Sequence, residues 1–200
     1  MSGARSLGRV RAGLARMDIT PSRPLELSGF VARKQPAQGV HDPLYVRALA
    51  LGEDSERLLL LVFDLIGVSG AFTAEVRGEV NRVTGVPPER IQVLATHTHG
   101  APAVLERARL GAVDEDYARF LVECAGVAAA QALSGGQSCR LEHLTATETT
   151  VAKNRRDPQG PRDFDLPVLL VRAAHGEPLG VLVSYACHPV VLGADNRLVT

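Results

Sequence analysis

The sequence is poor in the residues on which several classes of protein depend. It has no Trp, only 4% aromatic residues, and equal numbers of basic and acidic residues, 22 of each. Stacking of single-stranded nucleic acid needs aromatic side chains, and electrostatic binding of DNA or anionic lipid needs an excess of positive charge. We therefore expect no nucleic-acid partner.

Cysteine and long apolar runs are also scarce. The three cysteines, Cys124, Cys139 and Cys187, are far apart and form no CxxC pair, which indicates a chain that stays reduced. The longest apolar stretch, residues 58–68, is interrupted by Asp64 and is too short to span a bilayer. No apolar core of a signal peptide is visible near the N-terminus. These absences predict a cytoplasmic protein without a transmembrane segment.

What is present fits a globular domain. The 200 residues are 46% hydrophobic and 22% charged, which is typical of a soluble protein of one domain. Pairs of apolar runs flank short polar or glycine-containing segments and predict two β-hairpins. The runs cover residues 45–51 with 58–66, and residues 166–171 with 179–185.

Two further patterns predict helices. Apolar residues recur at helical spacing after Ser69 and again after Asp114, and Gly85 and Gly135 follow the two patterns as stop signals. Shorter runs over residues 10–19, 91–95 and 139–151 predict additional strands. The predicted fold class is therefore α/β (α+β), a mixed β-sheet with hairpins and with helices packed on it.

The segment His97-Thr98-His99 carries the most specific chemistry. Residues i and i+2 of an extended chain project to the same face, so both imidazoles can converge on one point. The pair directly follows the strand predicted over residues 91–95, and Zn²⁺ readily accepts imidazole ligands. These residues therefore predict a metal site at the strand ends. The alternative is a pair of ordinary hydrogen-bonded histidines.

Three other residues could join that site. His188 follows an apolar run and could supply a further nitrogen, unless it is only a hydrogen-bonded histidine at a strand end. Asp64 ends the apolar run that begins at residue 58, where it could orient an imidazole or act as a general base, or else cap the helix after Ser69. His41 precedes a strand and could reach the same edge of the sheet.

The segments that carry these residues resemble, in order, those of the neutral/alkaline (non-lysosomal) ceramidase family. The similar segments are AGLARMDITP at 12–21, GVHDPLYVRA at 39–48, FDL at 63–65, ATHTH at 95–99, KNR at 153–155 with FDLP at 164–167, and YACHP at 185–189. The two histidine segments are the most specific part of this resemblance.

The resemblance implies a bacterial, zinc-dependent amidase of sphingolipid or other lipid metabolism, which hydrolyses the N-acyl bond of a ceramide-like or other amide substrate. His97 and His188 would bind zinc, and His99 would act in catalysis by contacting the scissile amide or the metal-bound water. We expect Asp64 to assist His99 as a carboxylate. By the resemblance Asn154 and Arg155 belong to the substrate-binding loop, to which we add His41.

Two departures from the family pattern bear on this expectation. The family completes its zinc site with a Glu and a Tyr from a later part of its catalytic domain, and no segment here matches them. The family's Ser-Gly-Pro-Gly-Gly after the histidine pair is here residues 100–104, GAPAV. We therefore expect residues 1–200 to be an incomplete N-terminal part of such a domain. It would work as a homo-oligomer or with a complementing C-terminal half, or alternatively serve as a non-catalytic or truncated module that binds a metal or a partner.

Overall fold

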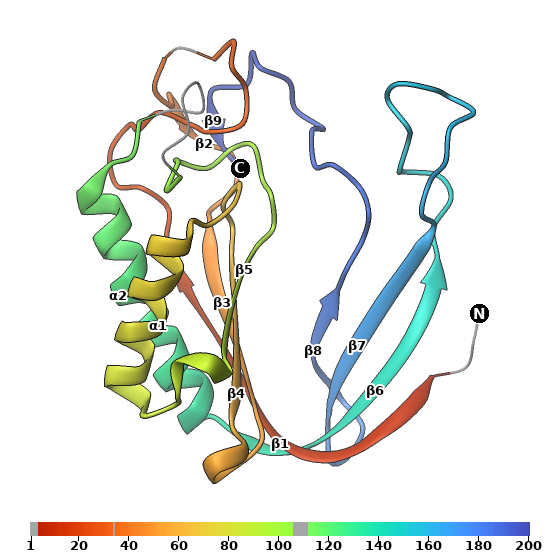
Figure 1. Ribbon diagram of the computed structural model, residues 1–200. Coiled ribbons are helices and arrows are strands. Elements are labelled where there is room, and N and C mark those ends of the chain that lie inside the picture. Colours follow the sequence, from red (N-terminus) through yellow and green to blue (C-terminus); the bar gives the residue numbers. More distant parts are fainter. Residues whose placement is uncertain (1–3, 34, 106–111) are drawn as a thin grey trace. The chain divides into compact units, whose positions relative to one another are not determined.

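The computed structural model describes residues 4–33, 35–105 and 112–200 (Figure 1). Contacts within the chain divide it into two compact units. Unit 1 contains residues 1–12 and 137–188, and unit 2 contains residues 13–136 and 189–200. The longest strand, β1 (Arg5–Asp18), contributes its first part to unit 1 and its second part to unit 2.

The elements follow one another in the order expected of a mixed α and β protein. After β1 come β2 (Gly39–Val40), β3 (Tyr45–Leu51), η1 (Asp54–Glu56), β4 (Leu58–Phe63), α1 (Gly70–Thr84), η2 (Pro88–Arg90), β5 (Ile91–Ala95), α2 (Glu115–Ser134), β6 (Gln137–Thr147), β7 (Asp165–Ala173), β8 (Pro178–Val183) and β9 (Leu198–Val199).

The hydrogen-bonded strands form a mixed sheet. Seven strands follow the order β5-β4-β3-β1-β6-β7-β8, while β2 and β9 form a small parallel pair. Strands β4 and β5 are parallel, whereas β3 pairs with β4, β1 with β6, β6 with β7 and β7 with β8 in antiparallel fashion. The predicted fold class and both predicted hairpins are confirmed.

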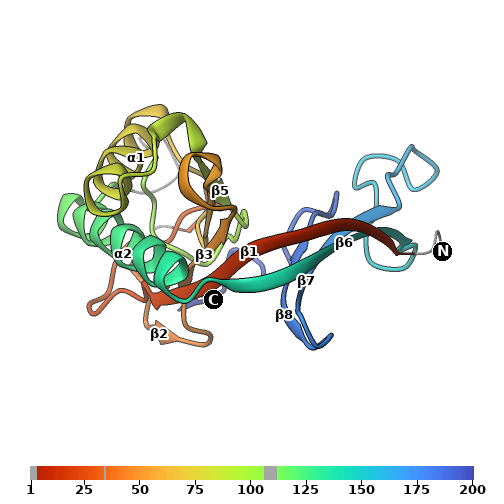
Figure 2. The same cartoon turned by 90° about the horizontal axis from the view of Figure 1, so that it is seen from below.

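In unit 2, α1 and α2 lie side by side against the strands β3, β4 and β5 (Figures 1 and 2). Burial alternates along β4: Leu59, Leu61 and Phe63 are fully buried, while Leu58 and Leu60 are half-buried. An apolar run by itself would also fit a strand covered on both faces, but here only the residues facing the helices are fully buried.

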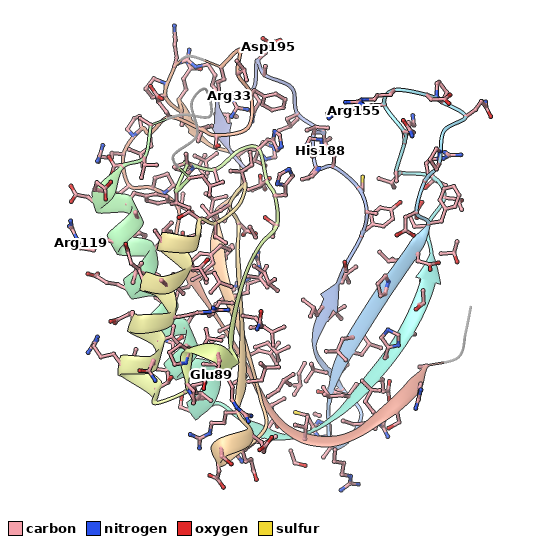
Figure 3. The ribbon with its side chains drawn as sticks, in the orientation of Figure 1. Arg33, Glu89, Arg119, Arg155, His188 and Asp195 are labelled. Carbon is pink, nitrogen blue, oxygen red and sulfur yellow. The ribbon has the colours of Figure 1, made fainter. Side chains whose placement is uncertain are left out.

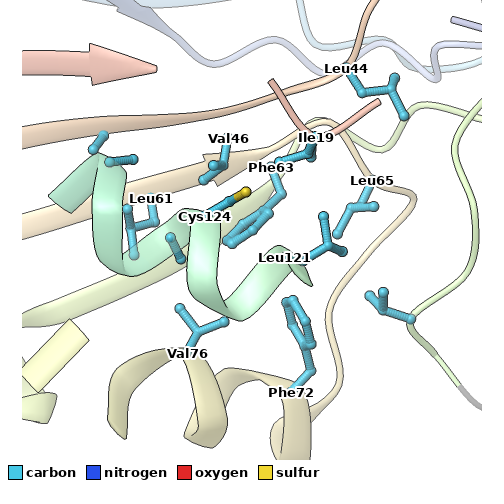
Figure 4. Close-up of a cluster of buried hydrophobic side chains, with 14 of the residues drawn as sticks. Ile19, Leu44, Val46, Leu61, Phe63, Leu65, Phe72, Val76, Leu121 and Cys124 are labelled. Carbon is cyan, nitrogen blue, oxygen red and sulfur yellow. The ribbon is translucent and has the colours of Figure 1, made fainter. Parts of the chain in front are cut away.

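The core of unit 2 lies between these helices and the sheet (Figure 4). Phe63 of β4 meets Phe72 of α1 edge to face, with 5.6 Å between the ring centroids. Leu121 of α2 and Val76 of α1 are fully buried in the same cluster. A fully buried leucine contributes roughly 1.5–3 kcal/mol relative to an exposed one, so this cluster fixes the strands whose ends carry the site.

Local chemistry sets the helix boundaries. The Ser69 hydroxyl accepts a hydrogen bond from the Phe72 amide, and Asp114 does the same for Tyr117. Gly85 ends α1 with φ of 72°, a left-handed conformation that favours glycine. The helix limits predicted from sequence are therefore confirmed to within a residue. Asp64 is not the cap of α1, because Ser69 fills that place.

Unit 1 is built on antiparallel strands. Strand β6 pairs with the first part of β1 on one side and with β7 on the other, and β7 pairs with β8. Glu142 of β6 forms ion pairs with Arg140 at 3.0 Å and with Arg172 of β7 at 2.9 Å. The pair with Arg172 joins two neighbouring strands, and cross-strand pairs of this kind stabilise a sheet.

Across residues 4–33, 35–105 and 112–200, none of the helices combines the length and the apolar character that crossing a membrane requires.

Candidate metal centre

The histidine segment begins where the pairing of β4 with β5 continues past the ends of both strands. The Thr96 amide donates to the Phe63 carbonyl at 2.9 Å, and the His97 amide donates to the Leu65 carbonyl at 2.9 Å. His97 has φ of 65°, which only a few per cent of non-glycine residues adopt. Backbone strain of this kind concentrates at functional sites, where the surrounding structure holds it in place.

The ring of His97 is fixed by the main chain. Its Nδ1 atom lies 2.6 Å from the carbonyl oxygen of Ile66. Because a carbonyl oxygen only accepts hydrogen bonds, Nδ1 carries a proton, and in the neutral form of the ring Nε2 then carries the lone pair. Metal-binding histidines commonly have this second contact to a carbonyl, which orients the ring and increases its basicity as a ligand.

His99 lies beside His97 and is buried, with 9% of its surface exposed. The two rings meet nearly at right angles, with centroids 5.2 Å apart, and one ring nitrogen of each lies within 4.8 Å of the other. The prediction that this pair of imidazoles converges is therefore supported by the geometry of unit 2. On its other side the His99 ring meets Phe30, with centroids 5.0 Å apart.

Thr200 supports the turn that carries the two histidines. The Thr98 hydroxyl donates to the Thr200 carbonyl at 2.7 Å, and the Thr200 amide donates to the Gly100 carbonyl at 3.1 Å. A Cβ atom on Gly100 would lie 2.5 Å from the side chain of Thr200. The absence of a side chain at Gly100 therefore allows the close packing of Thr200 against this turn.

His41, a predicted substrate-binding residue, is exposed and lies next to β9. Its Nδ1 atom is 2.7 Å from the carboxylate of Asp42, which also accepts a hydrogen bond from the Thr200 hydroxyl at 3.0 Å. The hydrogen bonds from His41 and then Thr200 hold the pKa of Asp42 below its usual value. The described contacts of the His41 side chain are thus with Asp42.

Asp64, predicted to assist catalysis, directly follows β4 and is mostly buried, its side chain being 15% exposed. Its Oδ2 atom accepts from the Tyr45 amide at 2.9 Å and from the Arg47 guanidinium at 2.7 Å. These contacts tie the end of β4 to the start of β3. They lie just before Leu65 and Ile66, the two residues whose carbonyls hold His97.

The remaining predicted site residues belong to unit 1. His188 is exposed and lies on the segment that follows β8, where it is the last residue of the unit (Figure 3). The side chain of Asn154 organises its own loop: Oδ1 accepts from the amides of Arg156 and Asp157, and Nδ2 donates to the Pro161 carbonyl at 3.2 Å. The next residue, Arg155, is exposed.

Within the described part of the chain, His97, His99 and His188 are the histidines that could hold a metal ion. The donor chemistry suits zinc, because a catalytic zinc site has three protein ligands, often imidazoles, and one open position. The hydrogen bond from His97 Nδ1 to the Ile66 carbonyl is the observation in this structure that fits such an ion, because it makes Nε2 the nitrogen that could bind it.

The sequence interpretation missed the residues that hold His99 in place. Residues 21–38 read as a long loop because they carry Pro, Gly, Ser and charges. In the structure Gly29, Phe30 and Arg33 of this loop contact His99. No pattern in the sequence signals these contacts, because the loop and His99 are far apart along the chain.

Comparison with solved structures shows what the fold is similar to. The neutral ceramidase from Pseudomonas aeruginosa matches 96% of this chain and 34% of its own, with a TM-score of 0.86 and 22% identity. A ceramidase complexed with C2 matches 96% of this chain and 33% of its own, with a TM-score of 0.84 and 22% identity. The chain therefore spans about a third of the length of these structures.

Comparisons of sequence alone give no match. No protein-family model matches the chain, and no curated protein does. The resemblance to the neutral ceramidases that the histidine segments indicated is thus confirmed by the structure: the chain shares the fold of about a third of a bacterial neutral ceramidase.

Proposed function

We propose that this chain is part of a zinc-dependent amidohydrolase of the neutral ceramidase type, which hydrolyses an N-acyl bond. The observation that carries the proposal is the His97 ring, held through Nδ1 by the Ile66 carbonyl on a strained backbone. Such a ring is prepared to bind a metal through Nε2 before the metal arrives. The fold shared with a neutral ceramidase supports the same reaction class.

The proposed ligands are His97 and His188, with His99 supplying the third nitrogen near the ion. Zinc bound there would supply a Lewis acid for an amide carbonyl and would lower the pKa of a bound water towards neutrality. The preference for zinc over other divalent ions is part of the proposal and rests on the all-imidazole donor set.

The chain's own residues then have separate tasks. His97 donates the proton on Nδ1 to the Ile66 carbonyl, so Nε2 is the nitrogen through which it would bind the ion. His99 is buried against Phe30, which excludes water from one side of its ring and suits its predicted role of contacting the scissile amide or the metal-bound water. Asp64 acts indirectly, by fixing the strand end that leads to the residues holding His97.

Substrate binding is proposed for three exposed or loop residues. Asn154 holds its loop through three hydrogen bonds and thereby sets where Arg155 stands, and Arg155 would donate to an oxygen of the substrate. His41, held by Asp42, would line the same site. The zero net charge suits a neutral small-molecule or lipid amide.

Completion of the active site is also a proposal. Because the chain spans about a third of the ceramidases that it resembles, we propose that activity needs a complementing C-terminal segment or a second copy of this chain. Action in the cytoplasm is a separate proposal, carried over from the sequence. The same short span favours one alternative, a module that binds metal but has no activity of its own.

Metal content tests the proposal directly. We expect the chain to bind one zinc ion, and His97→Ala and His188→Ala each to abolish stoichiometric binding as measured by calorimetry and elemental analysis. His175→Ala is the matched control, because His175 is exposed in a turn and pairs with Glu177. Unchanged zinc occupancy in both site variants would refute the site.

Activity separates the enzyme from the binding module. Short-chain and long-chain N-acyl amides are incubated with the chain alone and with the chain plus the C-terminal part of a neutral ceramidase, with and without zinc, and the released amine is measured. Zinc-dependent release that His97→Ala removes supports the amidase. Stoichiometric zinc binding without release from any of these amides supports the module.

A further inference from the structure

A loop of unit 2 that is remote in sequence wraps around His99. Leu27 forms an isolated antiparallel bridge with Pro102, and the Ser28 amide donates to the Ala101 carbonyl at 2.8 Å. Residues 28–33 therefore lie along the segment that follows His99. The loop closes on itself through the Arg33 amide, which donates to the Phe30 carbonyl at 3.0 Å.

Gly29 is the closest point of this loop to the imidazole. Its φ is +110°, and a Cβ atom built on it would lie 2.5 Å from both Cγ and Nδ1 of His99. No side chain fits in that space, so the backbone of Gly29 lies directly against the Nδ1 edge of the ring. The Nε2 edge of His99 consequently faces away from the loop.

Phe30 and Arg33 contact His99 from two other sides. The Phe30 ring meets the His99 ring edge to face at 5.0 Å. The Arg33 guanidinium donates through Nη1 to the His99 carbonyl at 2.7 Å and to the Ser28 carbonyl at 3.1 Å. It also lies 5.0 Å from the centre of the Phe30 ring. Backbone and ring of His99 are thus both held by one loop.

The burial of Arg33 shows that this contact is more than a surface hydrogen bond. Desolvation lowers the pKa of Arg33 from its usual value, so the charged guanidinium is held at a cost that its carbonyl partners must offset. A charge kept partly buried beside two main-chain carbonyls fixes the separation of those carbonyls. One of them belongs to the loop and the other to His99.

We propose that residues 28–33 are a positioning loop that fixes the His99 imidazole with Nε2 towards the metal ion. The inference rests on the proposed metal site and adds the residues that fix the position of His99 Nε2 in that site. Neither Gly29 nor Arg33 contacts the ion or the substrate in this proposal; both act through His99. Preorganised rings of this kind bind a metal more tightly than rings that must be ordered on binding.

The experiment measures metal affinity, with Co²⁺ as a spectroscopic probe and Zn²⁺ by competition. We expect Gly29→Ala and Arg33→Met to weaken binding about 10- to 100-fold, the range seen when a residue that orients a ligand is lost, and to change the visible Co²⁺ spectrum. Arg33→Lys should not restore affinity fully, because an ammonium lacks the planar fork of the guanidinium.

A matched control separates backbone strain from contact with His99. Gly8 has φ of +108°, almost the same as Gly29, but a Cβ atom there meets nothing within 4 Å. Gly8→Ala therefore carries the same conformational strain without touching a histidine. We expect it to lower thermal stability as Gly29→Ala does, but to leave the metal affinity and the Co²⁺ spectrum unchanged.

The NMR spectrum of the metal-free chain tests the positioning loop even if no metal binds. The aromatic proton resonances of His99 should be shifted by the nearby Phe30 ring, and Phe30→Leu and Gly29→Ala should both move them. Unchanged His99 resonances, or unchanged Co²⁺ affinity in Gly29→Ala and Arg33→Met, would overturn the positioning loop. Absence of metal binding by the unmutated chain, with the resonances moved as expected, would instead overturn the proposed metal site.

Discussion

The Nδ1 atom of His97 lies 2.6 Å from the main-chain carbonyl oxygen of Ile66. This hydrogen bond joins the turn after β5 to the segment after β4, two strands that run parallel and are linked through α1. It gives the two nitrogens of the His97 imidazole different functions. Nδ1 stabilises the local structure, while Nε2 is left in the form that a metal ion accepts.

This division predicts that the two roles can be separated by substitution. In His97→Asn the amide nitrogen can take the place of Nδ1 and donate to Ile66, and Asn tolerates the left-handed φ of 65° better than most residues. We expect stability close to that of the unmutated chain and a loss of stoichiometric zinc binding. Chemical unfolding and zinc calorimetry measure the two effects.

The companion variant His97→Ala should lose both properties. It removes the hydrogen bond to Ile66, at a cost of about 1 kcal/mol, and it places Cβ-bearing alanine at a φ that it disfavours. If His97→Asn bound zinc as tightly as the unmutated chain, Nε2 of His97 would not be a ligand.

Asp64 and Arg47 are expected to act as one unit. Asp64 is mostly buried and its Oδ2 atom lies 2.7 Å from Nη1 of Arg47, whose side chain is 47% exposed. Because one partner is solvated, the pair should contribute about 1 kcal/mol. A double-mutant cycle with Asp64→Asn and Arg47→Met, followed by urea unfolding, should give a coupling energy of that size.

The same variants test how Asp64 serves the proposed site. We expect Asp64→Asn to leave zinc stoichiometry at one per chain, because the carboxylate contacts β3 through Tyr45 and Arg47. Loss of zinc from this variant under conditions where it remains folded would show a more direct role than the one proposed.

Much of the fold was predictable because its signals are local. Ser69 and Gly85 bracket α1 with a side-chain cap and a left-handed stop, and both residues stand at the predicted places. The hairpin of β3 and β4 follows from two apolar runs around a short polar segment. Chemistry within a few residues decides these elements, so a single sequence contains enough information to place them.

The site was predictable only in part, because some of its contacts join distant segments. The i, i+2 spacing of His97 and His99 predicted their convergence, although the backbone at His97 is left-handed and not extended as that argument assumed. The left-handed backbone at His97 and the packing of Gly29 on His99 depend on loops that the fold brings together. The alternating burial of β4 was not predictable either, since an apolar run does not tell how many faces of a strand are covered.

Removal of the α1 cap should cost a defined amount of stability. The Ser69 hydroxyl accepts from the Phe72 amide at 3.0 Å, and alanine would leave that donor without its partner. We expect Ser69→Ala to lower the free energy of unfolding by about 1 kcal/mol. Ser134→Ala is the matched control. The Ser134 hydroxyl is exposed and donates to the Gln131 carbonyl at the C-terminal end of α2, so its loss should change stability by much less. Equal losses in both variants would contradict the capping role.

Tyr117 should make the stability of unit 2 depend on alkaline pH. Its hydroxyl is buried and donates to the Ile19 carbonyl at 2.8 Å, which joins α2 to the end of β1. Burial, with smaller effects from Cys124 and Asp18, raises the pKa of Tyr117 well above its usual value. Because the folded pKa exceeds the unfolded one, the neutral hydroxyl contributes stability that is fully present below about pH 10.

As the pH rises above that value, only the unfolded chain can release the proton easily, so unfolding becomes more favourable. The free energy of unfolding should then fall by up to about 1.4 kcal/mol per pH unit until the folded pKa is reached. Tyr117→Phe should cost about 1 kcal/mol at neutral pH and should flatten this alkaline fall, whereas Tyr185→Phe should leave the fall in place. Urea unfolding between about pH 8 and pH 11 measures this fall of the free energy of unfolding. An equally steep fall in Tyr117→Phe would show that the buried hydroxyl is not its source. The hydrogen bond between Tyr117 and Ile19 would then not account for the alkaline loss of stability.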